Sequence, residues 1–321
     1  MQTATLYKKK LKARGKTLIR DWKKSLGRYW QLYILLIPVV ANFVIFHYVP
    51  MSGIQIAFKD FMLNLGVWGS EWIGFEHFER FFNSYNFWTI LSNTLILSVV
   101  SLAFSFPLSV GLALLLNEIR HKKLNSALQT IFIAPHFVST VVVVGMMQAF
   151  LSPETGVINI ILEKLGVIEE GIYFTRLEQW FRPMYIISGI WQNLGWNAII
   201  YLSALSAIDT SLYEAASIDG ASRWQQLWRI TLPCIWPTIV IQLILKCGHI
   251  MSVGYEKVLL MQTSTNLNVS EIISTFVYMK GIKSQQYDYA TAIGLFNAVI
   301  NLIVLLAVNR IAKKRSEVSL F

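Results

Sequence analysis

The sequence contains few charged residues and few cysteines. Asp, Glu, Lys and Arg together make up 14% of its 321 residues, and the only cysteines are Cys234 and Cys247. Both fall in one apolar segment, so they indicate small packing residues and no disulfide framework. The five histidines are scattered, without an H-E-x-x-H pattern or a Cys/His cluster. We therefore predict no metal site and no catalytic group.

A nucleotide-binding motif is also missing. Gly15-Lys16-Thr17 matches the end of a phosphate-binding loop, but that motif requires glycine at position 10, where the sequence has lysine. No strand-like segment precedes it. We predict that this chain binds no cofactor, and that ATP and Mg²⁺, if they are used, are bound by a partner protein.

Apolar residues are abundant instead. They make up 55% of the sequence, and the mean hydropathy is +0.50. A helix needs about 20 consecutive apolar residues to cross the hydrocarbon layer of a membrane. The sequence predicts an all-α polytopic membrane protein with six transmembrane helices, at residues 31–50, 89–116, 127–151, 184–207, 234–254 and 290–309.

The basic residues predict the orientation of these six helices. Nineteen Lys and Arg residues lie in the two ends of the chain and in the loops at 117–126 and 208–233, whereas the three alternate loops hold eight. Short basic loops stay on the cytoplasmic side. Both termini are therefore predicted to be cytoplasmic, and the chain divides into an arm at 1–30, a transmembrane domain at 31–312 and a basic tail at 313–321.

The formal net charge of +10 belongs largely to these flanking segments. Anionic lipid headgroups are accordingly the expected partner, and nucleic acid is not. In the arm, Leu18, Trp22, Leu26 and Tyr29 recur at helical spacing among basic residues. The arm is predicted to be an amphipathic helix on the inner membrane surface, or else a solvated basic tail that sets the topology.

The loop at 208–233 has its own local pattern. Ser211 and Glu214 match a capping box at a helix start, and Ser222 and Gln225 match a second one. Gly220, between them, permits a sharp backbone bend. Two short helices joined at Gly220 are the prediction. On spacing alone, an ordinary capped loop between two spans explains the pattern equally well.

The residue identities in this loop are more informative about the protein family than the spacing of its capping residues. Glu214-Ala215-Ala216, Asp219-Gly220-Ala221 and Ile230-Thr231-Leu232-Pro233 resemble the EAA loop of permease subunits in binding-protein-dependent ABC importers. The resemblance covers residues 30–315 and is strongest for the carbohydrate-importing branch, which includes the larger permease of the maltose importer. YMKGI at 278–282 and YATAIGLF at 289–296 are most similar to permeases for pectin-type oligosaccharides.

The resemblance implies a bacterial cytoplasmic-membrane complex. In it, a homologous second permease pairs with this one, two ATPase domains bind the permease loops, and an extracellular substrate-binding lipoprotein delivers the sugar. Glu214 would sit in a cleft of the ATPase. The residues implied in coupling to the ATPase are Glu214, Ala215, Ala216, Asp219, Gly220, Ala221 and Pro233.

Polar residues inside the spans indicate where substrate passes, because they are costly in lipid. Gln192, Asn193 and Trp196 share one face of the fourth span. Amides bond sugar hydroxyls and indoles stack on sugar rings. These three residues also align with sugar-contacting positions of the maltose permease. Hydrogen bonding between helices is the alternative role.

Lys246 is the one basic residue inside a predicted span. It is placed about midway along 234–254, and at helical spacing His249 would share its face. The corresponding position of the maltose permease is a serine that contacts a neutral sugar. We predict that Lys246 pairs with the carboxylate of an acidic, uronic-acid-containing oligosaccharide such as a pectin fragment. A structural hydrogen bond to a neighbouring helix or to the partner permease is the alternative.

Other functions are less consistent with the sequence. The same importer class with a neutral oligosaccharide would leave Lys246 without a carboxylate to bind. An ion-coupled secondary transporter usually has a carboxylate within its spans, and none lies well inside these six. A membrane-embedded enzyme would need a nucleophile, an acid/base pair or a metal cluster.

Overall fold

The computed structural model describes residues 27–316 and 318–320. The chain divides into two compact units, which we treat separately. One consists of the N-terminal segment up to Ile56 together with Met62–Ser70, and the other of Ala57–Phe61 together with Glu71 onward. The amphipathic helix predicted for the arm at 1–30 lies almost wholly outside the described residues.

The first unit is dominated by one apolar helical segment. The segment runs from Trp30 to Phe58, over 29 residues, of which Ala57 and Phe58 are assigned to the second unit, and it is long and apolar enough to cross a membrane. Its parts are α2 (Trp30–Phe43), the π-helical turn η1 (Val44–Tyr48), α3 (Val49–Met51) and the 3-10 helix η2 (Ser52–Phe58), and α4 (Gly66–Gly69) follows. The predicted span at 31–50 is part of this segment.

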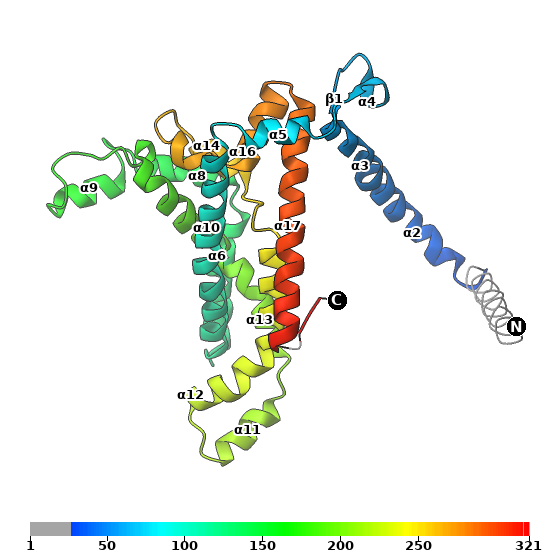
Figure 1. Ribbon diagram of the computed structural model, residues 1–321. Helices are drawn as coiled ribbons and strands as arrows, with labels where there is room; N and C mark the ends of the chain where they lie inside the picture. The colour runs from blue at the N-terminus through cyan, green and yellow to red at the C-terminus, as the bar shows by residue number, and fades with distance from the viewer. Residues whose placement is uncertain (1–26, 317, 321) are drawn as a thin grey trace, which may run out of the picture. The chain divides into compact units, whose positions relative to one another are not determined.

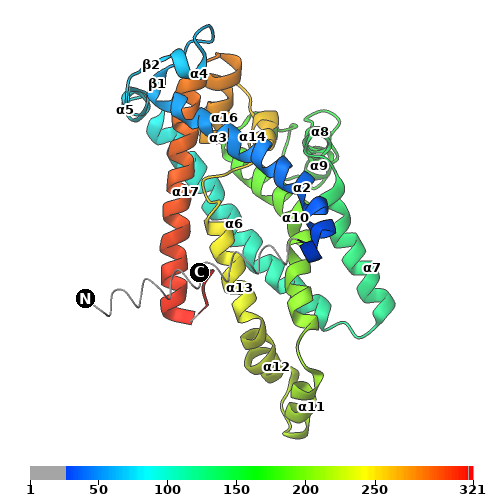
Figure 2. The same ribbon diagram turned by 90° about the vertical axis from the view of Figure 1, so that its right-hand side faces the viewer.

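The second unit contains the remaining helices and one small hairpin (Figures 1 and 2). Its longer helices are α6 (Phe87–Asn117), α7 (Lys122–Ile133), α8 (Thr140–Phe150), α10 (Glu178–Ser206), α13 (Leu232–Cys247) and α17 (Tyr287–Ser316). Its shorter elements are β1 (Lys59–Asp60), β2 (Glu71–Trp72), α5 (Glu76–Phe82), η3 (Ala134–Phe137), α9 (Val157–Lys164), η4 (Phe174–Arg176), α11 (Thr210–Ile218), α12 (Arg223–Gln226), η5 (Leu227–Thr231), α14 (Tyr255–Met261), α15 (Leu267–Ser270), α16 (Ile273–Tyr278) and η6 (Met279–Lys283).

Within the described residues, length and composition identify four helices that could cross a membrane, and five if a bent pair counts as one span. They are Trp30–Phe58, Phe87–Asn117, Arg223–Cys247 and Tyr287–Ser316, with Lys122–Phe137 and Thr140–Phe150 as the pair. The chain is thus an α-helical polytopic membrane protein. The predicted span at 184–207 overlaps the part of α10 up to Ser206, and α10 is not among these helices.

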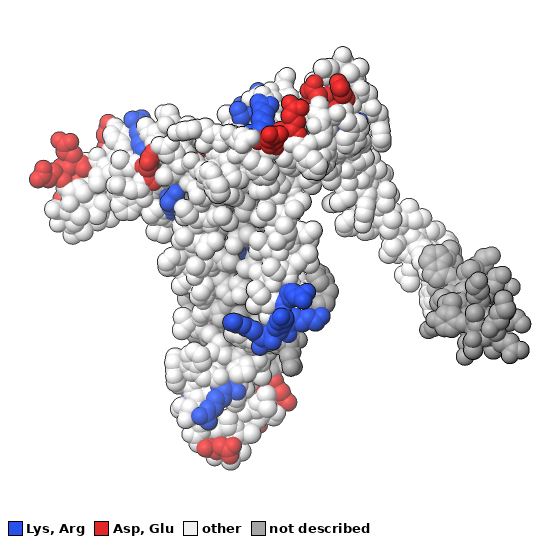
Figure 3. Space-filling model, in the orientation of Figure 1, with Lys and Arg blue, Asp and Glu red and all other residues white. Residues whose placement is uncertain are grey.

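Charged side chains are unevenly distributed over the surface of the second unit (Figure 3). In this view they gather toward its two ends, and the surface between these ends is almost uncharged. A hydrocarbon layer accommodates such an uncharged band, because it cannot solvate charged side chains.

Three apolar clusters hold the second unit together, and α6 contributes to all of them. Phe87 and Ile90 belong to the first, Leu97 to another, and Leu112 to the third, which also contains residues of α10 and α13. Ser101 and Ser105 lie between these positions of α6. The apolar packing therefore leaves a polar stretch halfway along the bundle.

Two predicted continuous spans are interrupted in the structure. The third, expected at 127–151, bends by 96° between η3 and α8. Pro135 lies just before the bend, Val138 and Ser139 are extended, and the Ser139 hydroxyl caps the new helix by accepting from the Val142 N–H. The helix predicted over 127–151 is therefore broken at Val138 and Ser139.

The fifth span, expected at 234–254, differs at both ends. Its helix begins earlier, at Arg223, and ends at Cys247. Residues 248–254 are non-helical and lead to α14. Lys246 accordingly lies in the last turn of α13 and not midway along a helix. The carbonyls at a helix C-terminus favour a cation there.

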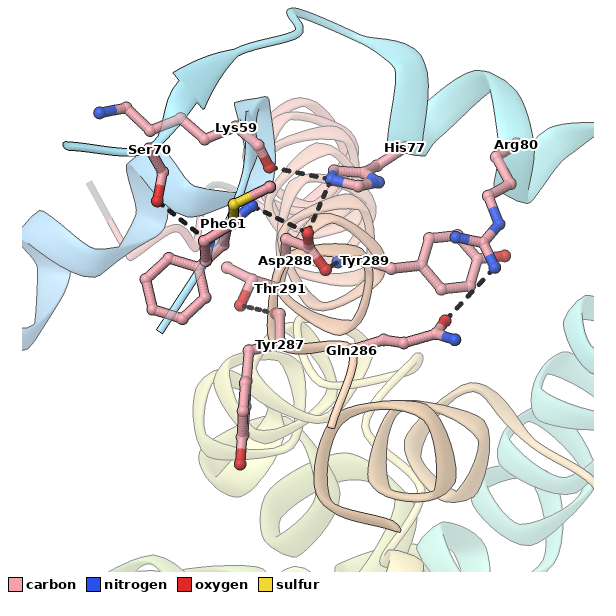
Figure 4. A network of polar contacts seen from close by, with 11 residues as sticks. Lys59, Phe61, Ser70, His77, Arg80, Gln286, Tyr287, Asp288, Tyr289 and Thr291 are labelled. Atoms are coloured by element: carbon pink, nitrogen blue, oxygen red, sulfur yellow. Dashed lines mark hydrogen bonds and ion pairs between the residues drawn. The ribbon is translucent and has the colours of Figure 1, made fainter. Parts of the chain in front are cut away.

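The hairpin and α5 are fastened to the start of α17 by polar contacts (Figure 4). β1 pairs antiparallel with β2, with Lys59 opposite Trp72. The His77 imidazole lies 3.0 Å from the Lys59 carbonyl oxygen and 3.4 Å from an Asp288 carboxylate oxygen, which also accepts from the Phe61 N–H at 3.1 Å. These contacts define the end of the bundle opposite α11 and α12 (Figure 2).

Candidate functional site

The loop between α10 and α13 forms two short helices, as predicted, but the first begins earlier than expected. α11 starts at Thr210, and the Asp209 carboxylate accepts from the Ser211 N–H at 2.9 Å. This hydrogen bond lowers the pKa of Asp209. The predicted capping box of Ser211 and Glu214 was therefore wrong, because Asp209 takes the capping position.

Gly220 forms the bend between the two helices. Its φ of 77° is left-handed. The Ala221 N–H donates to the Ala216 carbonyl at 2.9 Å, and the Gly220 N–H to the Ser217 carbonyl at 3.2 Å. Together these bonds make a Schellman motif, whose C′ position favours glycine.

The start of α12 confirms the second capping prediction. The Ser222 hydroxyl accepts from the Gln225 N–H, and the Gln225 side chain accepts from the Ser222 N–H at 2.7 Å. α12 continues through the π-helical turn η5 into α13, where Pro233 is the second residue. The second helix of the loop is therefore continuous with α13, from Arg223 to Cys247.

Side-chain contacts stiffen the pair of helices. Gln226 Nε2 donates to the Ser217 hydroxyl at 3.0 Å, so that α12 is tied to α11. The Tyr213 and Thr231 hydroxyls, 3.0 Å apart, tie α11 to η5. Arg223 donates to the Glu118 carboxylate at 3.1 Å, just beyond α6. These contacts hold α11, α12 and η5 together as one protrusion that is attached to the bundle.

The residues predicted to couple to an ATPase lie on or between α11 and α12, except Pro233, which lies in the first turn of α13. Glu214, Ala215, Asp219, Gly220 and Pro233 are exposed, and Ala216 and Ala221 are half-buried. Large apolar side chains are exposed beside them, namely Leu212, Ile218, Trp224 and Trp228. Exposed polar and apolar groups on a stiff element suit docking of another protein.

A polar cavity of about 620 Å³ lies in the bundle beside the serines of α6. That volume is within the usual range of roughly 300–1,000 Å³ for small-molecule sites. It is lined by Ser101, Ser105, His136, Phe137, Val138, Ser139, Thr140, Tyr185, Ile186, Gly189, Ile190, Gln192, Asn193, Asn197, Lys246, Gly254 and Lys257. None of the described residues lining it is Asp or Glu, so its charged groups are all cationic.

Gln192 and Asn193 line this cavity but also hold the backbone at the bend in the third span. Gln192 Nε2 donates to the Val138 carbonyl at 2.8 Å. The Asn193 amide oxygen lies 3.0 Å from His136 Nδ1, and since an amide oxygen only accepts, that nitrogen donates. Part of the hydrogen-bonding capacity of both amides is therefore used within the protein.

Trp196 lies next to the cavity without lining it. Its ring stacks on His136, with centroids 4.4 Å apart and the planes 8° apart. The side chain is 47% exposed. Sequence reasoning missed His136, because it lies on η3 and only the fold brings it to α10.

Lys246 lines the cavity and His249 does not. Lys246 Nζ donates to Asn197 Oδ1 at 3.2 Å, and the side chain is exposed. His249 follows the end of α13 in a turn. A second lysine, Lys257 of α14, was missed because it belongs to the loop predicted between the last two spans.

Close relatives of the chain are known. It is 44% identical over 301 residues to the protein LplB of Bacillus subtilis, covering 94% of each chain. It is 45% identical over 290 residues, or 90% of each chain, to the polygalacturonan/rhamnogalacturonan transport system permease protein YteP of the same organism.

Two solved structures of ABC transporters are also similar to this chain. A chain of a bacterial ABC transporter involved in the import of the acidic polysaccharide alginate superposes with a TM-score of 0.84 at 44% identity, over 92% of this chain and 99% of the other. A second structure, of a bacterial alginate ABC transporter in complex with its pentasaccharide-bound periplasmic protein, matches at 42% identity and the same TM-score.

The family model for the inner membrane component of binding-protein-dependent transport systems matches residues 105–317, which include the loop at Gly220 and most of the residues lining the cavity. With relatives this similar over nearly their whole length, the chain belongs to that family, and it is a multi-pass permease subunit of an ABC importer, with a transport and not a catalytic role.

Proposed function

We propose that this permease carries an acidic, uronic-acid-containing oligosaccharide of the pectin type into the cell. The observation that supports it most is the cavity, which combines hydroxyls, amides and the Lys246 ammonium with no carboxylate among its described lining residues. Hydroxyls and amides suit sugar hydroxyls, and an ammonium suits a carboxylate. Relatives whose names specify polygalacturonan/rhamnogalacturonan and alginate support the same class.

The proposed topology has six spans with both termini in the cytoplasm. Trp30–Phe58, α6, the bent pair, α10, the helix ending at Cys247, and α17 are these spans. α10 lacks a long uninterrupted apolar stretch because it carries polar residues of the cavity, such as Asn193 and Asn197, which face protein and substrate instead of lipid.

The proposed assembly contains a second, homologous permease, two ATPase domains that bind ATP and Mg²⁺, and an external binding protein. Glu214 would be seated in the ATPase, with the Gly220 bend shaping the contact. The continuous helix from α12 to Cys247, which carries Lys246 in its last turn, supports a mechanical link, because movement of the protrusion reaches the cavity through that helix.

Transport by the reconstituted complex tests this function. With saturating binding protein and ATP, proteoliposomes should accumulate trigalacturonate in preference to its fully methyl-esterified, uncharged form. Lys246→Ser should lower uptake of the acid by about fivefold, as expected for losing an ion pair worth about 1 kcal/mol.

Two measurements control for assembly. Complex yield and basal ATP hydrolysis of Lys246→Ser should stay normal. A wild-type preference for the ester, or a parallel fall of assembly and uptake in the variant, would contradict the proposed role of the acidic substrate.

A further inference from the structure

Lys257 is a buried lysine that has no acidic partner among the residues that the structure describes. Its side chain, in α14, is 8% exposed. Its ammonium donates to the Tyr185 carbonyl at 3.1 Å and lies 4.9 Å from the centre of the Tyr185 ring. In the described part of the chain, no carboxylate lies within ion-pair distance of it.

Burial makes this ammonium costly in the empty protein. An ammonium has three donors, and only one hydrogen bond is found here. Desolvation accordingly lowers the pKa of Lys257 to about 8. Its apolar neighbours in the sequence, Val258 and Met261, belong to a core cluster with Val144 of α8 and Phe181 of α10.

The same ammonium borders the cavity that contains Lys246. Across from it is Gly189 of α10, where an added Cβ would lie 3.4 Å from Lys257 Nζ. The glycine leaves the space beside the ammonium open. The other titratable side chains that line the cavity are His136, Tyr185 and Lys246.

A second group in this cavity also lacks a partner. The Ser101 hydroxyl oxygen of α6 is buried and makes no hydrogen bond to any described residue. Buried polar groups are usually hydrogen-bonded, so an unpaired one next to a cavity indicates a missing water or ligand group. An incompletely bonded ammonium and an unbonded hydroxyl thus line one space.

We propose that Lys257 is a second carboxylate-binding group of the permease, so that one oligosaccharide places one uronate at Lys257 and another at Lys246. The inference rests on the proposed function. Lys257 comes from α14, near the end of the bundle opposite α11 and α12 (Figure 1), and Lys246 comes from the last turn of α13. A chain of at least two uronates would therefore lie along the cavity.

Substrate affinity of the isolated membrane complex tests this site. The complex of both permeases and the ATPases is placed in nanodiscs without its binding protein, so that the binding protein's own preference does not enter. Equilibrium binding of radiolabelled trigalacturonate and of its trimethyl ester is measured for the wild type and for Lys257→Met, which keeps the length of the side chain but removes its charge.

We expect Lys257→Met to raise the Kd for trigalacturonate by about tenfold or more, because a buried charge-assisted pair is lost. The Kd for the ester should change less than twofold. Lys257→Arg, which retains a cation, should recover most of the affinity for the acid. Lys283→Met, a loss of an exposed lysine on η6 that does not line the cavity, should change neither value.

Two results would overturn the inference. In one, Lys257→Met leaves the Kd for the acid unchanged although the wild type prefers the acid and Lys246→Ser weakens its binding. In the other, acid and ester lose affinity equally and complex yield falls with them, which indicates a structural role. A wild type that prefers the ester would instead refute the proposed function itself.

Discussion

Replacing Gly220 by alanine tests whether the bend between α11 and α12 is needed for coupling. The backbone there has a φ of 77°, and nothing lies within 4 Å of an added Cβ. The substitution therefore introduces no collision, and its effect is conformational. An L-residue in the left-handed region costs about 1–2 kcal/mol. The population with the correct bend should fall by about five- to thirtyfold relative to unbent alternatives.

The assay is ATP hydrolysis by the reconstituted complex, with and without substrate-loaded binding protein. We expect Gly220→Ala to weaken binding of the ATPase subunits and to lower substrate-stimulated hydrolysis. Gly220→Asn is the matched control, because asparagine is larger than alanine but tolerates the left-handed region. It should be closer to the wild type than alanine is. If both variants are equally impaired, or if alanine has no effect, the conformational argument is wrong.

Three further outcomes are expected. In a protein whose two cysteines are replaced by alanine, a cysteine at Glu71 should react with an impermeant thiol reagent from outside intact cells and one at Ser222 should not; the reverse would exclude cytoplasmic termini. Gly195→Ala should lower the free energy of unfolding, measured by thermal denaturation of the complex, by about 1–3 kcal/mol, because its Cβ would lie 2.2 Å from a backbone carbonyl oxygen of α7. Gly111→Ala in α6, which has open space around it, is the control and should leave the free energy of unfolding unchanged. Raising the pH from 7 to 9 should weaken trigalacturonate binding, because Lys257 loses its proton as the pH passes about 8, and Lys257→Arg should remove this weakening.

Capping and glycine rules predicted the two short helices of the loop correctly, but they did not predict the residue at which α11 begins. The Gly220 bend and the Ser222 cap depend on a few neighbouring residues, and the structure has both. At the start of α11, Asp209 and Ser211 are both good capping residues, and sequence spacing favoured the second. In the structure the Asp209 carboxylate makes the capping hydrogen bond, to the Ser211 N–H.

The cavity could be predicted only in part, because it combines residues that are far apart in the sequence. The face of α10 with Gln192 and Asn193 followed from helical periodicity, and Lys246 from its position in an apolar run. His136 reaches the same place only because the third span bends at Val138. Pro135 was a signal for that bend, but proline also occurs within intact membrane helices.

Lys257 was beyond sequence reasoning for a different reason. A lysine in a polar connection is normally exposed, and its burial here arises from the packing of α14 on α8 and α10. The number of spans likewise depends on packing, because it depends on whether α10 is counted. α10 has the length of a span, but its composition reflects the cavity it lines, and composition alone does not distinguish that from a surface helix.

The two lysines should contribute unequally to substrate binding. Lys246 is exposed, already bonded to Asn197 and placed at a helix C-terminus, so water and helix carbonyls stabilise its charge without substrate. Lys257 is buried and incompletely bonded, so a carboxylate supplies what the empty site lacks. Loss of Lys257 should consequently weaken binding of the acidic substrate more than loss of Lys246 does.

Residues 248–254 connect the positions of the two lysines without helical structure, so movement of α13 can change the separation of the two ammonium groups. A carboxylate pair that matches this separation in only one conformation would bind there more tightly and be released on conversion to the other.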